Sequence, residues 1–414
     1  MSGGSAELVA IGSELLGPAR TDTNGSFLTR RLGEAGIAVR FRTIVGDTPA
    51  DLEDVLRNAL RRSQVVIATG GLGPTIDDLT REAAAAVLDL PLDEDPSILR
   101  DLEDRYRKRG LVMPPQNRRQ AQVPRGAEVI PNPHGSAPGL ALRHVGRLLV
   151  LLPGVPLEMR TMFDASVGPM LPASGMRFAT RILKIAALTE SEVDHRLDPV
   201  ARSAAPVEWT ILAAPGQVEI HLRERVPDGG GSPGIDRIDR QCAAILGDHL
   251  FGRDEETLEE IVGGRLLARK ESVATAESLT GGLIAARLSS IAGASGWLAG
   301  GMVCYGEAAK TGLGGVAADL IAAHGAVSAP VAEALAAGAR ATLRTTWGVS
   351  ATGYAGPDSG PEGPPGTVFV AIAGTSVRRH AALRLPGDRA AIRKRAAQSA
   401  LDLLRRAILG GDRA

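Results

Sequence analysis

The sequence predicts two three-layer α/β/α domains joined by a small α+β module. Short apolar runs alternate with amphipathic runs in both the N-terminal and the C-terminal parts, which is typical of largely parallel sheets. Between these parts, two alternating apolar and polar strands follow one predicted helix. A chain of 414 residues is also too long for one ordinary domain. The expected domains are residues 1–170, 171–254 and 255–414.

The first segment alternates apolar runs, which predict strands, with amphipathic runs, which predict helices. The alternation implies a largely parallel sheet covered by helices. The expected strands are residues 7–12, 37–45, 65–71 and 147–154, and the expected helices are residues 24–35, 51–62 and 78–88.

The second and third segments are assigned in the same way. A Gly-rich and Pro-rich stretch at residues 227–234 ends the middle strands and indicates a linker or a long hairpin tip. The expected middle strands are residues 180–188, 207–214 and 217–225, with helices at 190–202 and 235–246. The expected C-terminal strands are residues 272–278, 300–305, 346–353 and 367–374, with helices at 257–269, 283–291 and from 388 onward.

Composition excludes several classes of protein. Lys+Arg and Asp+Glu both number 47, so the net charge is zero. The chain therefore lacks the strong positive field that would indicate a nucleic-acid partner. Cys242 and Cys304 lie far apart and offer neither a disulfide framework nor a zinc cluster. The sequence contains neither a signal peptide at its start nor a run of 18 apolar residues, so we expect a cytoplasmic protein without a membrane segment.

The most informative residues of the third segment are Ser278, Tyr305 and Lys310. Ser278 is expected where an apolar strand ends and a helix begins, which places its hydroxyl near helix N-terminal amides that can stabilise an oxyanion. A serine nucleophile needs a base, and neither His324 nor His380 lies in a Gly-flanked loop after a strand. Lys310 is the better candidate if burial lowers its pKa, and Tyr305 could relay the proton.

Spacing alone leaves a structural alternative open. Ser278 or Thr280 could serve only as a helix N-cap, which is the commonest role of such residues. Lys310 could be a solvated surface charge, although lysine is rare here, with five lysines among 47 basic residues. The residues by themselves therefore allow both interpretations, a catalytic pair or a helix cap and a surface charge.

A family resemblance favours the catalytic interpretation. The runs ATAESLTGGLIAARLS, GGMVCYGEAAKTGLGG, GAVSAPVAEALAAGA, ATGYAGPDSG and PPGTVFVAIAG occur in this order and resemble the CinA C-terminal family. The match covers nearly all of residues 257–410. Stand-alone members of this family are nicotinamide-nucleotide amidases.

The resemblance implies roles for individual residues. Ser278 would be the acylated nucleophile, Lys310 its general base and Tyr305 an assistant. The substrate would be nicotinamide mononucleotide, which is hydrolysed to ammonia and the acid nucleotide without a metal or other cofactor. Arg389 or Arg393 would receive the phosphate. The implied substrate-binding residues are Thr280, Gly281, Gly282, Thr352, Gly353, Gly356, Arg389 and Arg393.

The chain departs from the family pattern beside these residues. Leu279 follows the serine where the family usually has cysteine, and Gly306-Glu307 stand where it commonly has Ser-Asn. These departures leave open whether the amidase is active or its substrate changed.

A second candidate site lies in the first segment. Glycines after an apolar strand let backbone amides approach a phosphate, and parallel sheets bind ligands at the carboxyl ends of their strands. Nearby carboxylates could hold a divalent metal, for which Asp47 and Asp78 are the candidate ligands. The alternative is that the glycines form turns and the aspartates cap helices. The candidate nucleotide-site residues are Gly12, Glu14, Asp47, Gly70, Gly71, Gly73, Thr75, Asp77 and Asp78.

Here too the order of motifs resembles a known family. IGSELL, TDTNGSFLTRRL, ATGGLGPTIDDLT, NPHGSAPG and LLPGVPLEM are similar to the CinA N-terminal domain, a relative of the molybdopterin-binding proteins MoaB and MogA. The resemblance covers about residues 6–170 and implies a metal-dependent ADP-ribose pyrophosphatase. Asp47 and Asp78 match the acidic pair of the relatives, Glu158 is a further candidate, and the turn GPARTD (17–22) departs from the pattern.

The middle segment resembles the KH-like connector of full-length CinA proteins. It lacks the Gly-x-x-Gly loop with which KH domains grip nucleic acid, so we expect a spacer that supports a homodimer. Two alternatives to an enzyme of pyridine-nucleotide recycling remain open. One is a molybdopterin- or nucleotide-binding protein, and the other is a non-enzymatic competence or DNA-damage partner with a degenerate amidase site.

Overall fold

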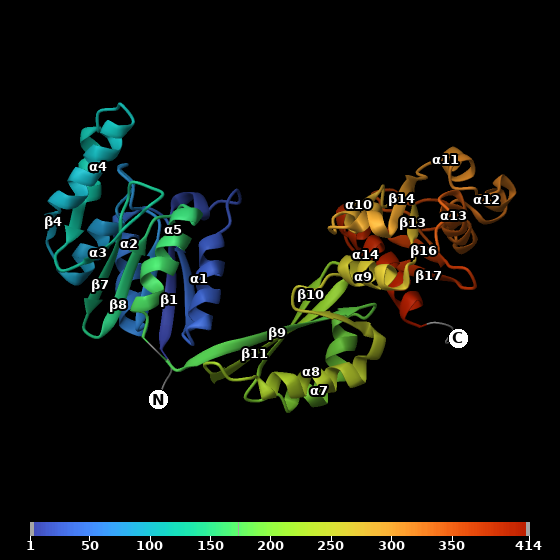
Figure 1. The fold of residues 1–414 in the computed structure, drawn as a ribbon, viewed down its shortest axis with the longest axis horizontal. Coiled ribbons are helices and arrows are strands. Elements are labelled where there is room, and N and C mark those ends of the chain that lie inside the picture. The colour runs from blue at the N-terminus through green and yellow to red at the C-terminus, as the bar shows by residue number, and fades with distance from the viewer. Residues whose placement is uncertain (1–3, 173, 411–414) are drawn as a thin grey trace. The chain divides into compact units, whose positions relative to one another are not determined.

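The computed structural model describes residues 4–172 and 174–410. It confirms the predicted fold class, because α/β domains occupy the N-terminal and C-terminal parts of the chain (Figure 1). The chain forms two compact units. One contains the residues up to Ala179 together with Arg225–Gly231, and the other contains Thr180–Glu224 and the residues from Ser232 on. The middle module therefore shares a compact unit with the C-terminal domain.

The sheet of the first unit has the strand order β2-β1-β3-β8-β7-β6. Strands β2, β1, β3 and β8 are parallel, and β7 and β6 continue the sheet antiparallel. The strands are β1 (Ser5–Ile11), β2 (Ala38–Val45), β3 (Val65–Thr69), β6 (Glu128–Ile130), β7 (Gly139–His144) and β8 (Arg147–Leu152), and β4 (Leu92–Glu94) pairs separately with β5 (Gln122–Pro124).

Side-chain alternation along these strands builds two cores, one on each face of the sheet. Val9 and Ile11 pack with side chains of α2, α3 and α4, whereas Ala6 and Leu8 pack with those of α1 and α5. This is the three-layer arrangement that buried parallel strands require. The helices are α1 (Thr23–Glu34), α2 (Pro49–Arg62), α3 (Thr80–Leu88), α4 (Pro96–Lys108), α5 (Pro156–Met162) and α6 (Gly168–Met170).

The middle module is a sheet of order β10-β11-β9-β12 with two helices. Every second residue of β11 is buried, as expected for a strand with one face against helices. Thr189 and Glu192 form a capping box that begins α7. The elements are β9 (Met176–Ala186), α7 (Glu190–Arg202), β10 (Glu208–Ala214), β11 (Gln217–Pro227), α8 (Pro233–Leu246) and β12 (Leu250–Arg253).

The C-terminal sheet has the order β14-β13-β15-β16-β17, with the first three strands parallel and the last two antiparallel. Helices α9, α10 and α14 cover one face, and α12 and α13 contribute to the cores on the other. The strands are β13 (Val273–Glu277), β14 (Leu298–Val303), β15 (Trp347–Gly353), β16 (Thr367–Ala373) and β17 (Arg378–Arg384). The helices are α9 (Leu258–Arg269), α10 (Leu283–Ser289), α11 (Glu307–Gly312), α12 (Ala318–His324), α13 (Ala329–Thr342) and α14 (Arg389–Leu409).

Both cysteines are buried free thiols. In the part of the chain that the structure describes, no helix combines the length and the apolar character that crossing a membrane requires.

Candidate active sites

Ser278 lies directly after β13, at the start of a tight turn into α10. Its N–H donates to the carbonyl of Ala351 on the neighbouring strand at 2.8 Å, so the sheet fixes its backbone. Gly281 and Gly282 follow with φ of 59° and 91°, a region in which a Cβ is strained. The turn thus needs these two glycines, and the Ser278 side chain is 6 % exposed.

Lys310 reaches Ser278 from α11, 32 residues along the chain. Its Nζ lies 3.1 Å from the Ser278 Oγ and 3.2 Å from the main-chain oxygen of Tyr305, and the residue is 3 % exposed. Burial lowers the pKa of Lys310, while the charges of Glu307 and Glu362 act in the opposite direction. The structure therefore brings together the predicted nucleophile and base, with the amine biased toward its neutral form.

Tyr305 contributes to this pair through its main chain. Its carbonyl oxygen accepts from both Ser278 Oγ, at 3.4 Å, and Lys310 Nζ. Its side chain is 57 % exposed, and its hydroxyl accepts from Nη2 of Arg389 at 2.8 Å. The phenol that we expected to relay a proton thus contacts an arginine in this structure, and the carbonyl orients the pair.

The expectation of oxyanion stabilisation by the helix amides needs correction. Two amides of the first turn of α10, those of Ile284 and Ala285, donate to the carboxylate of Glu277 at 3.0 and 2.8 Å. Glu277 is fully buried, and its carboxylate already accepts the two helix amides that we expected for an oxyanion. The remaining candidates are the N–H groups of Leu279 and Thr280, which have no main-chain acceptor among the described residues.

The other predicted residues of this site shape it from behind. Thr352 is buried and donates its hydroxyl to the carbonyl of Ala326 at 3.0 Å. A Cβ on Gly353 would lie 2.6 Å from the carbonyl oxygen of Thr367, so β15 and β16 pack too closely there for a side chain. Gly356 has φ of 84°. These positions set backbone geometry, and their contact with a substrate stays a prediction.

Arg389 and Arg393 both project from the first turns of α14. Arg389 donates to the carbonyl of Gly356 at 2.7 Å, and Arg393 donates to the carbonyls of Leu279 and Thr280 at 3.1 and 2.7 Å. Arg393 thereby holds the turn that follows Ser278. Within the described residues, the hydrogen-bond acceptors of both guanidinium groups are neutral oxygens.

The first unit carries a cavity of about 730 Å³ at the carboxyl ends of its parallel strands. The ends of β1, β3 and β8 all line it, together with the start of α1, which is where open α/β sheets bind ligands. Gly70 has φ of 108°, and a Cβ there would lie 2.1 Å from the carbonyl oxygen of Ile11. Predicted residues Gly12, Gly71 and Gly73 line the same cavity, whereas Thr75 does not.

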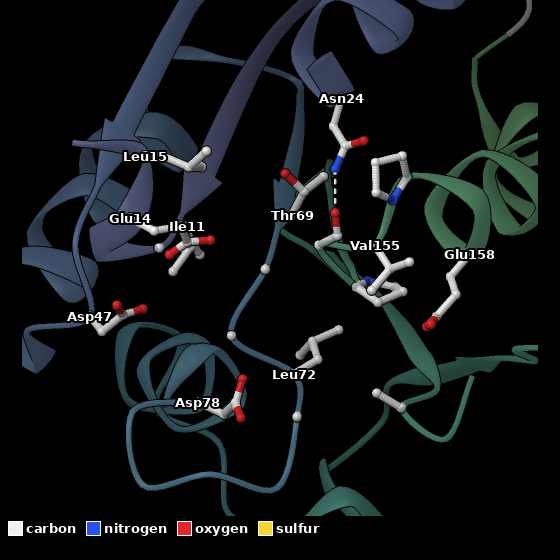
Figure 2. Close-up of a pocket in the computed structure, with 18 of the residues that line it drawn as sticks. Ile11, Glu14, Leu15, Asn24, Asp47, Thr69, Leu72, Asp78, Val155 and Glu158 are labelled. Atoms are coloured by element: carbon white, nitrogen blue, oxygen red, sulfur yellow. Dashed lines mark hydrogen bonds between the residues drawn. The ribbon is translucent and has the colours of Figure 1, made fainter. Parts of the chain in front are cut away.

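The carboxylates of this cavity point to different parts of it. Figure 2 shows Glu14 and Asp47 on one side and Glu158 on the other, with Asp78 beside the glycine loop. Asp47 accepts from the N–H of Ser13, and Asp78 accepts from that of Thr75, each at 2.8 Å.

The hydroxyl of Thr75 also donates to Asp77 and thereby lowers the pKa of that carboxyl group. Within the described residues, no group of three or more His, Cys, Asp or Glu side chains could hold a metal ion. Asp78 thus caps its own loop, whereas Asp47 accepts from a residue of the segment that follows β1. The assignment of a divalent metal to Asp47 and Asp78 stays a prediction.

Two charged residues of the sites were not anticipated. Arg81 is 1 % exposed and donates to the carbonyls of Leu72 at 2.6 Å and Gly73 at 3.0 Å, so it holds the glycine loop from beneath. Glu277 performs the corresponding task for the nucleophile turn. A charged residue at a strand end or early in a helix, directly beside a glycine turn, is the signal that could have revealed both.

The chain matches known proteins over nearly its full length. Residues 255–408 match the family model described as CinA C-terminal domain, and residues 7–173 match the one described as "Probable molybdopterin binding domain". A CinA-like protein of Anaeromyxobacter sp. (strain Fw109-5) is 46 % identical over 97 % of this chain and 98 % of its own length. One from Koribacter versatilis is 43 % identical over 98 % and 100 %.

A solved structure of the protein CinA from Thermoplasma acidophilum aligns with 41 % of this chain and 99 % of its own, at 32 % identity and a TM-score of 0.39. The two family models match in the order that the sequence motifs predicted, and the full-length relatives share both. The chain belongs to the CinA family.

Proposed function

We propose that the C-terminal domain is a Ser–Lys amidohydrolase that deamidates nicotinamide mononucleotide. The observation that carries this proposal is the buried contact of 3.1 Å between Lys310 Nζ and Ser278 Oγ, with the pKa of the lysine lowered by burial. An activated serine needs a base within hydrogen-bond reach, and the Lys310 amine meets that requirement.

The proposed reaction proceeds in two halves. Neutral Lys310 takes the Ser278 proton while Oγ bonds to the carboxamide carbon, and the resulting ammonium gives that proton to the departing nitrogen, which leaves as ammonia. Water then attacks the acyl ester. The proton of this water passes to Lys310 and from there to the released Ser278 Oγ. The cationic pyridinium ring withdraws electrons from the carboxamide, which eases both attacks.

Charge on both sides of Ser278 suits this substrate. Glu307 and Glu362 lie close enough to raise the pKa of Lys310, and their field also attracts a cationic ring. Arg389 and Arg393, which have neutral acceptors, supply positive charge for a phosphate. The substrate carries both charges in one molecule.

The test is ammonia release from nicotinamide mononucleotide. Wild-type chain should release it, and Ser278→Ala and Lys310→Met should each lower kcat by at least about 10³-fold, because neither half of the pair acts alone. Ser289→Ala and Lys108→Met, which lie outside the pair, should leave the rate unchanged. A well-folded wild-type chain that releases no ammonia would contradict the proposal and favour a degenerate site around Leu279 and Glu307.

For the first unit, we propose cleavage of the diphosphate of ADP-ribose in the 730 Å³ cavity. The support is the glycine loop Gly70–Gly73, which follows β3 and lines this cavity, because glycines at the carboxyl end of a parallel strand let the backbone approach a phosphate. Since Mg²⁺ is commonly bound through one or two carboxylates plus substrate phosphates, a divalent ion would arrive with the diphosphate and be a part of the substrate.

The measurement is AMP formation from ADP-ribose with and without added divalent ion. Asp78→Ala should abolish product because Asp78 fixes the loop through Thr75, while Asp101→Ala, on the exposed side of α4, should retain it. Binding of ADP-ribose or a pterin without turnover would instead make this unit a ligand-binding domain.

A further inference from the structure

A second cavity, of about 540 Å³, lies inside the second unit, away from Ser278 and Lys310. It lies at the seam between the middle module and the C-terminal domain, lined by the segment after β9, the tip of the β10–β11 hairpin, the end of β17 and the middle of α14. Its volume is in the range of small-molecule sites, which is roughly 300–1,000 Å³.

The β10–β11 hairpin packs closely against α14 beside this cavity. Gly216 at the hairpin tip packs against α14, where an added Cβ would lie 2.7 Å from the Cβ of Gln398. The side chain of Gln398 also accepts from Arg287 at 2.7 Å and donates to Gln217 at 3.0 Å. The hairpin is therefore fixed on the helix, and the cavity beside it has defined walls.

The lining combines an aliphatic wall with polar residues, among which Arg395 stands out. Leu188, Val218, Leu383 and Leu403 are among the aliphatic side chains that line the cavity. Arg395 also lines it, and its Nε is buried without a hydrogen-bond partner within the described residues. Buried donors in folded proteins are nearly always satisfied, so such an Nε indicates that an acceptor from outside the chain is expected here.

The remaining charged residues of the lining are the acids Glu190, Glu192 and Asp402 and the arginines Arg384 and Arg406, so their charges largely cancel. Arg406 pairs with Asp402 at 2.8 Å, and Glu192 accepts from the N–H of Thr189 at 2.8 Å within the capping box. Arg384 donates to the neutral hydroxyl of Thr367. The balance of arginines and acids around the cavity disfavours a polyanion such as a nucleotide diphosphate, and the Arg395 guanidinium favours a single negative charge.

We propose that this cavity is a binding site for a small organic anion that carries one carboxylate on an apolar body. The carboxylate accepts from the Arg395 guanidinium, as charge-assisted pairs of this kind do. The apolar body fills the space between the leucine and valine side chains of the hairpin, β17 and α14. This site is separate from the proposed amidase and does not depend on its activity.

The test uses anilinonaphthalene sulfonate, a fluorescent monoanion with an apolar body, titrated into the full-length chain and then displaced. Arg395→Gln should weaken binding about tenfold, because it removes one charged hydrogen bond. Ser399→Trp, which places an indole on the cavity wall, should abolish it. Lys394→Gln, one residue before on an exposed part of the same helix, should bind as wild type does.

Displacement distinguishes the ligand classes. Octanoate should release the bound dye, whereas inorganic phosphate and nicotinamide mononucleotide at equal concentration should not. Release by phosphate alone would overturn the assignment of an organic anion. Equal dye binding by wild type, Arg395→Gln and Ser399→Trp, each with an unchanged circular dichroism spectrum, would overturn the site itself, as would an absence of dye binding to wild type.

Discussion

Lys310 is the residue on which the proposed chemistry depends most. An amine takes a proton only when it is neutral, and burial lowers the pKa of Lys310 because the charged form loses its hydration. The nearby carboxylates of Glu307 and Glu362 favour the charged form and oppose this shift. Glu307, one of the departures from the family pattern, therefore adjusts the fraction of neutral amine.

The pH dependence of kcat/KM follows from these directions. Activity should rise with pH as Lys310 loses its proton and level off above its pKa, below the range of an ordinary lysine. Glu307→Gln removes a negative charge that stabilises the ammonium, so the pKa should fall and the rising limb should move to lower pH. Asp319→Asn, exposed on α12, should leave the limb in place. A limb that moves to higher pH would contradict the electrostatic role of Glu307.

At the residue scale, the sequence predicted the identity of the pair but not its surroundings. Strand-end and helix patterns placed Ser278 in a turn, and the scarcity of lysine drew attention to Lys310. Tyr305 was assigned a role for its hydroxyl, whereas its carbonyl makes the contacts. Main-chain contacts leave no mark on residue identity, so a sequence could not have predicted this one.

At the scale of elements, the turn between β13 and α10 depends on the buried carboxylate of Glu277. It accepts from the amides of Ile284 and Ala285 and from the hydroxyl of Thr275 at 3.2 Å. These donors would otherwise be buried without partners, which costs free energy. The hydrogen bonds of Glu277 thereby connect the end of β13 to the start of α10.

Replacement of Glu277 by the isosteric amide should test how much these hydrogen bonds contribute to stability. Ile284 and Ala285 donate to different oxygens of Glu277. Glu277→Gln keeps one acceptor oxygen but turns an N–H₂ group toward the N–H of the other residue, and it should lower the free energy of unfolding by about 1–3 kcal/mol. Urea denaturation of the full-length chain measures the loss. Glu333→Gln removes a carboxylate that pairs with His380 on the surface, where such pairs contribute little. Equal stability losses in the two variants would refute a special role for Glu277.

Two of the elements that the sequence analysis did not predict, β17 and α13, give a weak apolar signal. The edge strand β17, with sequence RRHAALR, carries arginines on its exposed face and lacks the continuous apolar run of a buried strand. Helix α13 is rich in alanine, which gives a weak periodic signal although its buried face contacts the sheet. The strands β1, β3 and β13, buried on both faces, were the easiest to predict.

At the scale of the whole molecule, the chain folds as two units with separate cores. One core cluster joins Ala186 and Phe251 of the middle module to the C-terminal helices, and the clusters of the first unit contain none of these residues. The sequence predicted three segments from pattern alone. Packing against the C-terminal domain groups the second segment with the third, and only tertiary contacts could reveal that grouping.

Separate cores predict separate unfolding. Calorimetry of the full-length chain should show two transitions, because multidomain chains depart from two-state behaviour. Nicotinamide mononucleotide at about 100 times its Kd should stabilise only the second unit, by roughly 2.7 kcal/mol. The transition of the first unit serves as the internal control. A single transition, or equal shifts of both, would refute independent units.

The hydrogen bond from the Ser278 amide to Ala351 also has a dynamic consequence. It makes Ser278 a continuation of the β13–β15 ladder, the kind of structure whose amides open only in rare, large-scale fluctuations. Lys310, the proposed base, instead lies on the six-residue helix α11, and short helices open at little cost. Excursions of the segment that carries Lys310 would interrupt the pair while the serine stays in register, so catalysis would be gated from the lysine side.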